Sequence, residues 1–564
     1  MKKIELALIM GCVLCLVSCN DLDLYPLEKG SSETWFTSQS QFEMAVNDFY
    51  RIEFWPLAKE AWTDDYTYRD TPGSSIISGT LNSEEEIVSD LWTNLYKAIA
   101  RTNTVLDNIK VGRANGISEE LLLQYEAEAK FARAAHYAHL VFTFGDVVYI
   151  DTPISIEDAY KMSRSPKDVV IQNIYNDFDF AAANLPEKYS QKNRATRGAA
   201  LALKARYALY FGDYEVAEKA AKECMDLQLY ELNDDFASLF HTRNAKESIF
   251  LLPRSLTYEV GLVGDARSYL SRTAGGFSSK LPSWDLFAIF ECTDGKTIDD
   301  SPLFDSHEPF KNRDPRCSAT IVEFGTEHLG IEYTPHPKEL KVMNYKTGKK
   351  VTNKDTRAKE QFASYNGLIW KKGIDESWGP STKYKPENDY VIIRYADVLL
   401  IYAEAKIEQN KIDKDVLDAI NLVRARAYGV KLEDRSKYPS ITTTDQKGLR
   451  NILRRERRVE FAFEGLRYYD IIRWKIAKKV FNKPNCGLLY PAKNLINKVV
   501  DKGHWFWPYA PEIDEDGFVD FLKMINSGLV QVLSKGSWSD RQYLWPIPAK
   551  ERIINPNLDQ NPGY

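Results

Sequence analysis

The sequence predicts a mainly α-helical fold, in which a scaffold of helical hairpins carries a long irregular, partly β insertion. Three observations support this prediction. Apolar residues recur at helical spacing in several stretches, alanines fall on their apolar faces, and Gly, Pro and aromatic residues concentrate between residues 229 and 390. Of the 564 residues, 27% are charged and 44% are hydrophobic, which is an ordinary globular composition and excludes a disordered or fibrous chain.

The first predicted helix has one apolar face with spacings of three and four. That face consists of Leu122, Tyr125, Ala129, Ala132, His136 and Leu140. Gly145 follows the last of them and is suited to end the helix. The alanines on this face indicate close contact with a neighbouring helix.

Two further stretches read as pairs of helices joined by short turns. The first pair has apolar positions from Leu201 to Ala208 and from Val216 to Leu227, separated by Gly212-Asp213. The second runs from Val398 to Ala405 and from Val416 to Ala427, across a polar turn at residues 409–411. Hairpins of about 30 to 35 residues with small residues and tight turns are similar to tetratricopeptide-type repeats, which bury their faces against neighbours.

The 12 Trp residues divide the chain. None lies between residues 93 and 283, where the first predicted hairpins fall. Three lie in the insertion at Trp284, Trp370 and Trp378, and the others lie in the early and late parts of the chain. Because binding residues tend to be carried on irregular segments, we expect some of these rings to form a binding surface.

The first 19 residues read as an export signal. Met1-Lys2-Lys3 precedes twelve residues from Leu6 to Val17 that are apolar and too short to span about 30 Å of hydrocarbon. Leu16-Val17-Ser18-Cys19 resembles the bacterial lipobox, so we expect residues 1–18 to be a lipoprotein signal peptide and Cys19 to be lipidated. The alternative is a plain cleaved signal with an incidental Cys.

The net charge of −6 and the absence of long basic runs argue against nucleic acid as a partner. Four Cys remain beyond Cys19, at positions 224, 292, 317 and 486, without metal-ligand spacing. Cys292 and Cys317 could form a disulfide in an oxidising compartment, although four Cys in a chain this long are more often unpaired.

Three groups of residues resemble one known family. They are Ile393 to Leu400 followed by Ala403-Glu404-Ala405; Glu456 to Tyr468 with Asp470 and Arg473-Trp474; and Leu544 to Pro548 with Asn555 to Leu558 and Gln560 to Tyr564. These motifs are similar to those of the SusD/RagB family of Bacteroidetes surface lipoproteins. The resemblance extends from the lipobox to the final Tyr and is weakest over residues 255–390.

The resemblance implies a single SusD-like domain over residues 19–564. Its helical scaffold would cover about 93–228 and 390–480, its variable ligand-binding insertion about 229–390, and its C-terminal segment 481–564. It implies a non-catalytic glycan receptor without a cofactor, anchored to the outer membrane by lipid and exposed on the cell surface. Such receptors bind oligosaccharides and deliver them to a TonB-dependent transporter of the SusC type. Asn20-Asp21-Leu22-Asp23 after the lipidated Cys is consistent with surface display.

A glycan receptor needs apolar platforms for sugar rings and polar groups for their hydroxyls. The stretch from Trp62 to Arg69 offers both, and we expect Trp62, Asp64, Asp65 and Tyr66 to bind glycan. The resemblance adds partners from the insertion, namely Trp284, Trp370, Trp378 and Tyr384. The alternative for each Trp is that it fills a local core, and for Trp92 we favour that packing role.

Three other groups of residues could suggest catalysis or metal binding, but each favours a structural interpretation. Glu456, Glu460 and Glu464 recur every four residues, but the arginines between them favour an ion-paired helix surface over glycoside hydrolysis. His136 and His139 have no third ligand at zinc spacing and are expected to pack. The run from Asp514 to Gly517 is similar to a calcium loop, but Lys523 stands where a bidentate Glu is needed.

Two alternatives to glycan uptake remain open at this stage. A peptide-binding lid of a RagB-like uptake system would have the same architecture and would hold its ligand through backbone hydrogen bonds. An enzyme would produce new reducing ends from a glycan.

Overall fold

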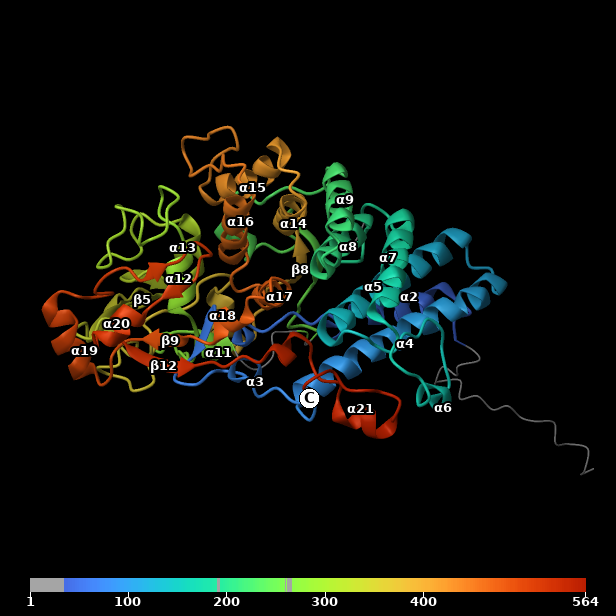
Figure 1. Cartoon of the computed structure of the whole chain (residues 1–564), viewed down its shortest axis with the longest axis horizontal. Helices are drawn as coiled ribbons and strands as arrows, with labels where there is room; N and C mark the ends of the chain where they lie inside the picture. Colours follow the sequence, from blue (N-terminus) through green and yellow to red (C-terminus); the bar gives the residue numbers. More distant parts are fainter. Residues whose placement is uncertain (1–34, 190–192, 259, 261–265) are drawn as a thin grey trace, which may run out of the picture.

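The computed structural model describes residues 35–189, 193–258, 260 and 266–564. The predicted signal peptide, the predicted lipidation site Cys19 and the acidic residues after it lie outside these residues. The mainly helical fold with a partly β insertion is confirmed (Figure 1). Within the described ranges, no helix combines the length and the apolar character that a membrane crossing requires.

The scaffold is a row of helices in which each packs against the next, except that the last helix, α16, packs on α14. In chain order they are α4 (Glu86–Ala114), α5 (Glu119–Phe144), α7 (Lys167–Asn184), α8 (Arg197–Phe211), α9 (Tyr214–Asp226), α14 (Tyr395–Glu408), α15 (Lys414–Ala427) and α16 (Gln446–Glu460). Helix α14 packs directly on α9, although the whole insertion separates them in sequence. The row runs from the right of Figure 1 to its upper centre.

Local sequence signals explain where these helices begin and end. The Ser118 hydroxyl accepts a hydrogen bond from Leu121 N–H at the start of α5, and Thr196 caps α8 in the same way. Gly145 and Gly212 follow the last residues of the two helices with φ of 75° and 86°, values that cost glycine little. Both glycines lie where the sequence placed the helix ends.

The insertion leaves the scaffold after α9 and returns through β8 (Tyr390–Arg394), which pairs antiparallel with β2 (Ser248–Leu252). Its four-stranded sheet has the order β4-β5-β6-β7, with strands Thr326–His328, Ile331–Tyr333, Lys341–Asn344 and Lys349–Thr352. An early segment joins it, because β1 (Tyr66–Tyr68) pairs antiparallel with β3 (Lys280–Pro282).

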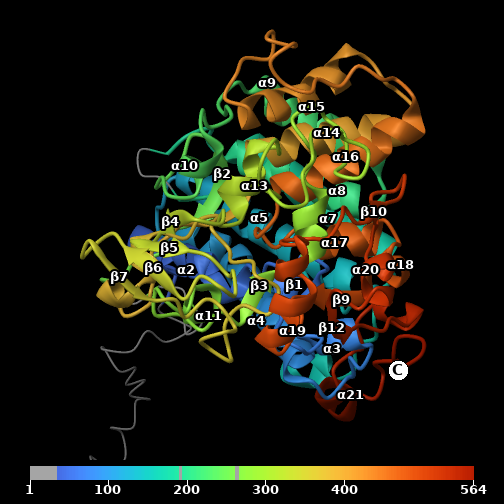
Figure 2. The ribbon, with the colours of Figure 1, turned by 90° about the vertical axis from the view of Figure 1, so that its left-hand side faces the viewer.

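A second hydrophobic core lies in the half of the molecule that faces the viewer in Figure 2. It combines residues of the insertion with residues of the C-terminal segment, among them Trp284, Trp370 and Trp507. The C-terminal segment contributes β9 (Pro484–Gly487), paired with β12 (Gln531–Lys535), and α19 (Ala492–Lys498). The insertion is thus folded around large rings and is not only a set of surface loops.

Candidate functional site

The indole of Trp62, expected as a binding platform, is 8% exposed and packs edge-on against two other rings. Its centroid lies 5.5 Å from that of Tyr468 and 5.3 Å from that of Trp545, from the C-terminal segment. Tyr66, in β1, is also buried, at 4%. Neither ring offers an open face to a sugar. Both fill a local core, which was the alternative considered for the Trp residues.

The carboxylates of Asp64 and Asp65 are held by arginines. Asp64 Oδ1 accepts from Arg467 Nε at 2.9 Å, and Asp65 Oδ1 accepts from Arg458 Nε at 2.7 Å. Burial raises the pKa of Asp64, but the charges of Arg458 and Arg467 outweigh it and hold that pKa well below its usual range. For Asp65, burial prevails and the pKa is raised. Both side chains are occupied in joining the early loop to the end of α16 and to α17 (Arg467–Arg473).

Trp284 and Trp370 lie inside the second core, at 1% and 0% exposed. Trp284 Nε1 donates to the Asn366 carbonyl at 2.8 Å, and its ring contacts Trp507 at 5.5 Å between centroids. Trp370 stacks on Phe463 at 4.4 Å. The expectation that these two rings are platforms fails in this structure, because rings of the C-terminal segment cover Trp284 and Phe463 covers Trp370.

Trp378 differs from the other insertion Trp residues because its ring lines a cavity of about 480 Å³, which we call the ring-lined cavity. Its walls carry five rings, from Phe240, Tyr269, Trp378, Tyr390 and Phe463. Polar groups face the cavity from Glu60, Arg254, Lys372, Asn388 and Glu464. A volume of this size with apolar walls and a few polar groups is typical of a small-ligand site, for which about 300 to 1,000 Å³ is usual.

Two groups in this cavity have strongly shifted pKa values. Burial, with the charge of Asp65, raises the pKa of Glu60 to about 8. Its Oε1 accepts from the Gly465 N–H at 3.0 Å, whereas Oε2 has no partner among the described residues. Burial lowers the pKa of Lys372 to about 8, although Glu464 opposes this shift. At neutral pH, Glu60 is therefore an uncharged group that can donate a hydrogen bond into the cavity.

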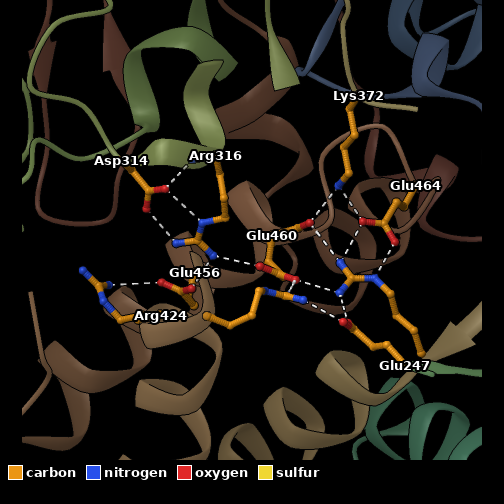
Figure 3. A network of polar contacts seen from close by, with 10 residues as sticks. Glu247, Asp314, Arg316, Lys372, Arg424, Glu456, Glu460 and Glu464 are labelled. Atoms are coloured by element: carbon orange, nitrogen blue, oxygen red, sulfur yellow. Dashed lines mark hydrogen bonds and ion pairs between the residues drawn. The ribbon is translucent and has the colours of Figure 1, made fainter. Parts of the chain in front are cut away.

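Lys372 and Glu464 also belong to a buried network of charges (Figure 3). Lys372 Nζ lies 2.6 Å from Glu464 Oε1, and Arg394 Nε lies 2.8 Å from Glu464 Oε2. Glu460 pairs with Arg316 at 2.9 Å and Glu456 with the same arginine at 2.5 Å. These glutamates are ion-paired as expected, but the expected surface position is wrong. Helix α16 contacts both α14 of the scaffold and α12 (Trp284–Ile289) of the insertion, which bury it.

A second feature is partly exposed, through Phe277, Phe362 and Tyr490, and we call it the arginine–aromatic patch. It consists of three arginines and the rings on which they stack: Arg69, Arg267, Arg357, Phe277, Phe362, Tyr365, Tyr384 and Tyr490. Tyr384 is the one member of the patch that was expected from the sequence to bind glycan. The patch adjoins the ring-lined cavity, because α11 (Ala266–Tyr269) contributes Arg267 to the first and Tyr269 to the second.

Sequence reasoning missed most of this patch because its members come from distant segments. The Arg69 side chain reaches the Phe277 carbonyl at 3.4 Å across 208 residues. A signal was present in the stretch from Trp62 to Arg69. Tyr66 and Thr67 are both buried, whereas Tyr68 and the Arg69 that follows β1 are half-buried.

The remaining candidates have structural roles. His136 and His139 are buried against aromatic rings, and burial lowers their pKa values to about 3 and 4. Asp514 and Asp516 both pair with Lys479. Among the described residues, no group of three or more His, Cys, Asp or Glu side chains is arranged to hold a metal ion.

The structure also decides whether Cys292 and Cys317 form a disulfide and whether Trp92 is a packing residue. Cys292 and Cys317 are both free and buried, so the disulfide that we weighed is not formed. Trp92 is 4% exposed and packs on Tyr96 and Phe144, in agreement with the packing role expected for it.

Comparison with known proteins identifies the family. A model described as the SusD family matches residues 257–564, and a second, described as starch-binding and associating with the outer membrane, matches residues 27–209. The chain belongs to the SusD family, and the resemblance found in the sequence motifs is confirmed. By these descriptions, carbohydrate binding and association with the outer membrane are features of the family.

Similar proteins cover the whole chain. It is 26% identical to a SusD-like protein of Formosa agariphila, over 100% of both chains. The structure of a SusD-like carbohydrate-binding protein from Bacteroides fragilis matches with a TM-score of 0.75 and 28% identity, covering 93% of this chain and 100% of that one. A second SusD-like protein from that organism matches with a TM-score of 0.71 and 24% identity, over 96% and 100% of the chains.

Proposed function

We propose that this protein is a lipid-anchored glycan receptor on the outer face of the outer membrane, which binds oligosaccharides and delivers them to a SusC-type TonB-dependent transporter. Membership of the SusD family supports the class of ligand. The observation that carries the proposal at the level of the site is the ring-lined cavity beside the arginine–aromatic patch, where flat apolar faces and polar groups lie together.

The receptor has no catalytic role in this proposal. A carrier must also release its ligand, so we expect a dissociation constant of roughly micromolar to millimolar, or about −8 to −4 kcal/mol. Tighter binding would hold the oligosaccharide on the receptor and slow its transfer.

A calorimetric binding screen over plant, host and microbial oligosaccharides tests the proposal. Peptides serve as competitors, because a RagB-like lid would prefer them. Binding of peptides but no glycan, or the appearance of new reducing ends on incubation, would contradict the glycan-receptor function.

A matched pair of ring variants locates the site once a ligand is found. Phe362, 40% exposed, belongs to the patch, whereas Tyr160, 48% exposed, follows α6 (Ile156–Ala159) on the scaffold side of Figure 1. Loss of an aromatic contact costs about 0.5 to 1.5 kcal/mol, so Phe362→Ala should weaken binding about 2- to 12-fold. Tyr160→Ala should leave it unchanged. Equal affinities for the two variants would place the site elsewhere.

Anchoring and delivery are tested separately. Cys19→Ala should move the protein from the membrane fraction to the periplasmic fraction, and the wild-type protein should copurify with a large outer-membrane transporter. Retention of the Cys19→Ala variant in the membrane would argue against a lipid anchor at this residue.

A further inference from the structure

We infer that the arginine–aromatic patch binds an acidic group of the glycan, a carboxylate or a sulfate ester, and that Arg357 is the residue that receives it. This inference rests on the proposed glycan-receptor function and adds the chemical class of the ligand. It names a residue that lies outside every motif by which the family resemblance was found.

Arg357 is held between two tyrosine rings. Its guanidinium carbon lies 3.9 Å from the centroid of Tyr365 and 3.8 Å from that of Tyr490. Tyr365 is buried, whereas Tyr490 is 44% exposed, so the edge of this sandwich is close to solvent. Stacking on both faces fixes the plane of the guanidinium without using any of its N–H groups.

The N–H groups of Arg357 have no acceptor in the described part of the chain. Neither Nε nor Nη1 makes a hydrogen bond there, and the side chain forms no ion pair with the described carboxylates. A positioned arginine normally satisfies its donors with a carboxylate or with carbonyls, as Arg394 and Arg316 do in the buried network. Both nitrogens are shielded from solvent, so an oxyanion of a ligand that enters beside the exposed Tyr490 would supply the missing acceptor.

The patch carries three arginines, in a chain whose net charge is −6. Arg69 and Arg267 both lie against Phe277, and neither forms an ion pair with a described acidic residue. Of the nearby carboxylates, Glu360 is paired with Arg272 at 3.1 Å. Asp70, which is exposed, is the acidic neighbour whose charge reaches Arg357. Asp70 is thus the one described carboxylate whose charge acts on Arg357, and no described cation is paired with it.

The exposed rings explain why the acidic group should belong to a sugar. Phe277 and Phe362, at 38% and 40% exposed, lie beside the arginines and offer apolar faces of the size of a sugar ring. An inorganic anion would use the arginines alone, whereas an acidic oligosaccharide would use both kinds of group.

The test is calorimetric titration of the full mature protein with matched pairs of probes. Oligogalacturonides and their methyl esters differ only in carboxylate charge, and sulfated carrageenan oligosaccharides and their desulfated forms differ only in sulfate. We expect tighter binding of at least one charged member than of its neutral partner. That preference should weaken as salt is raised from about 0.05 to 0.5 M, because salt screens charge.

Variants assign the preference to Arg357. Arg357→Gln should reduce affinity for the charged member about tenfold or more, the usual loss for a hydrogen bond to a charged group, and leave the neutral member unchanged. Arg357→Lys, which keeps the charge, should retain part of the affinity for the charged member that Arg357→Gln loses. Arg552→Gln, an exposed arginine on α21 (Ala549–Ile554), is the matched control and should change neither affinity.

The outcomes separate this inference from the function on which it rests. Binding of neutral members as tight as that of charged ones, or an unchanged charged affinity in Arg357→Gln, overturns the acidic-ligand inference and leaves the glycan receptor standing. No binding of any glycan overturns both. Because Arg357 bonds to no described residue, its variants should melt within a few degrees of the wild type.

Discussion

The Trp62 indole lies at a junction of three distant segments, since it contacts Tyr468 after α16 and Trp545 near the end of the chain. From the sequence alone we expected Trp62 to bind glycan. Its burial reverses that expectation.

We now expect Trp62→Ala to cost about 3 to 5 kcal/mol of unfolding free energy, as for other buried large-to-small replacements. Urea denaturation followed by circular dichroism measures it. Trp62→Phe, which keeps an apolar ring, should cost less. A Trp62→Ala variant with wild-type stability and lost glycan affinity would restore the original interpretation.

Glu60 provides a prediction on pH dependence. Its pKa is about 8 in the folded protein, against 4.5 as its usual value. The unfolded chain therefore releases this proton at lower pH than the folded chain, so Glu60 makes the fold less stable as pH rises from about 4.5 to 8. Glu60→Gln removes this loss and keeps an oxygen for the Gly465 N–H.

The difference in unfolding free energy between Glu60→Gln and the wild type should therefore grow in favour of the variant between pH 5 and pH 8. Urea titrations at several pH values, with both proteins in the same buffers, provide the measurement. A constant difference across this range would mean that Glu60 ionises normally in the fold.

At the scale of the element, α4 shows how the scaffold uses a small residue. Gly112 lies inside this helix, where a Cβ would come within 2.7 Å of the Phe42 ring and 2.8 Å of a Leu122 methyl group. Phe42 belongs to α2 (Gln39–Asn47) and Leu122 to α5, so Gly112 lets three helices approach closely.

Gly112→Ala should therefore destabilise the protein by roughly 1 to 3 kcal/mol, the usual cost of overpacking, although Ala is the better helix former by about 1 kcal/mol. Thr104→Ala, on the exposed side of the same helix, is the matched control and should be neutral or slightly stabilising. Thermal melts of both variants give the comparison. Stabilisation by Gly112→Ala would show that the neighbours can move aside.

At the scale of the whole molecule, the buried charges on α16 join the scaffold to the insertion. Glu460 is paired with Arg394 at the start of α14, with Arg426 in α15 and with Arg316 in α13 (Pro315–Thr320). Burial alone raises the pKa of Glu460, but these arginines outweigh it and hold that pKa below its usual range. The stabilisation is thus complete above about pH 4.5 and is lost as pH falls.

Replacing Glu460 by Gln should cost about 3 to 5 kcal/mol at pH 7, because it removes a buried carboxylate that three buried arginines share. The variant should also lose less stability than the wild type on acidification below pH 4.5. Glu157→Gln, at an exposed pair with Lys161, should change stability by less than about 0.5 kcal/mol. Urea denaturation at pH 7 and pH 4 measures both effects, and equal costs for the two variants would mean that the network is not stabilising.

The sequence by itself determined the family and most helices of the scaffold, although α4 and α7 were not predicted. Helical spacing, N-caps and terminal glycines act over a few residues, so the ends of α5 at Gly145 and of α8 at Gly212 could be read directly. The ion pairing of the α16 glutamates was also predictable, because the arginines alternate with them in the chain.

Only the tertiary structure decided which rings are accessible. A Trp in an irregular segment has the same local sequence whether it faces solvent or a core, and its burial depends on what packs over it. Rings of the C-terminal segment pack on Trp284 and Trp62, and Phe463 stacks on Trp370, whereas Trp378 lines a cavity. The patch around Arg357 joins segments hundreds of residues apart, so its chemistry exists only in the folded chain.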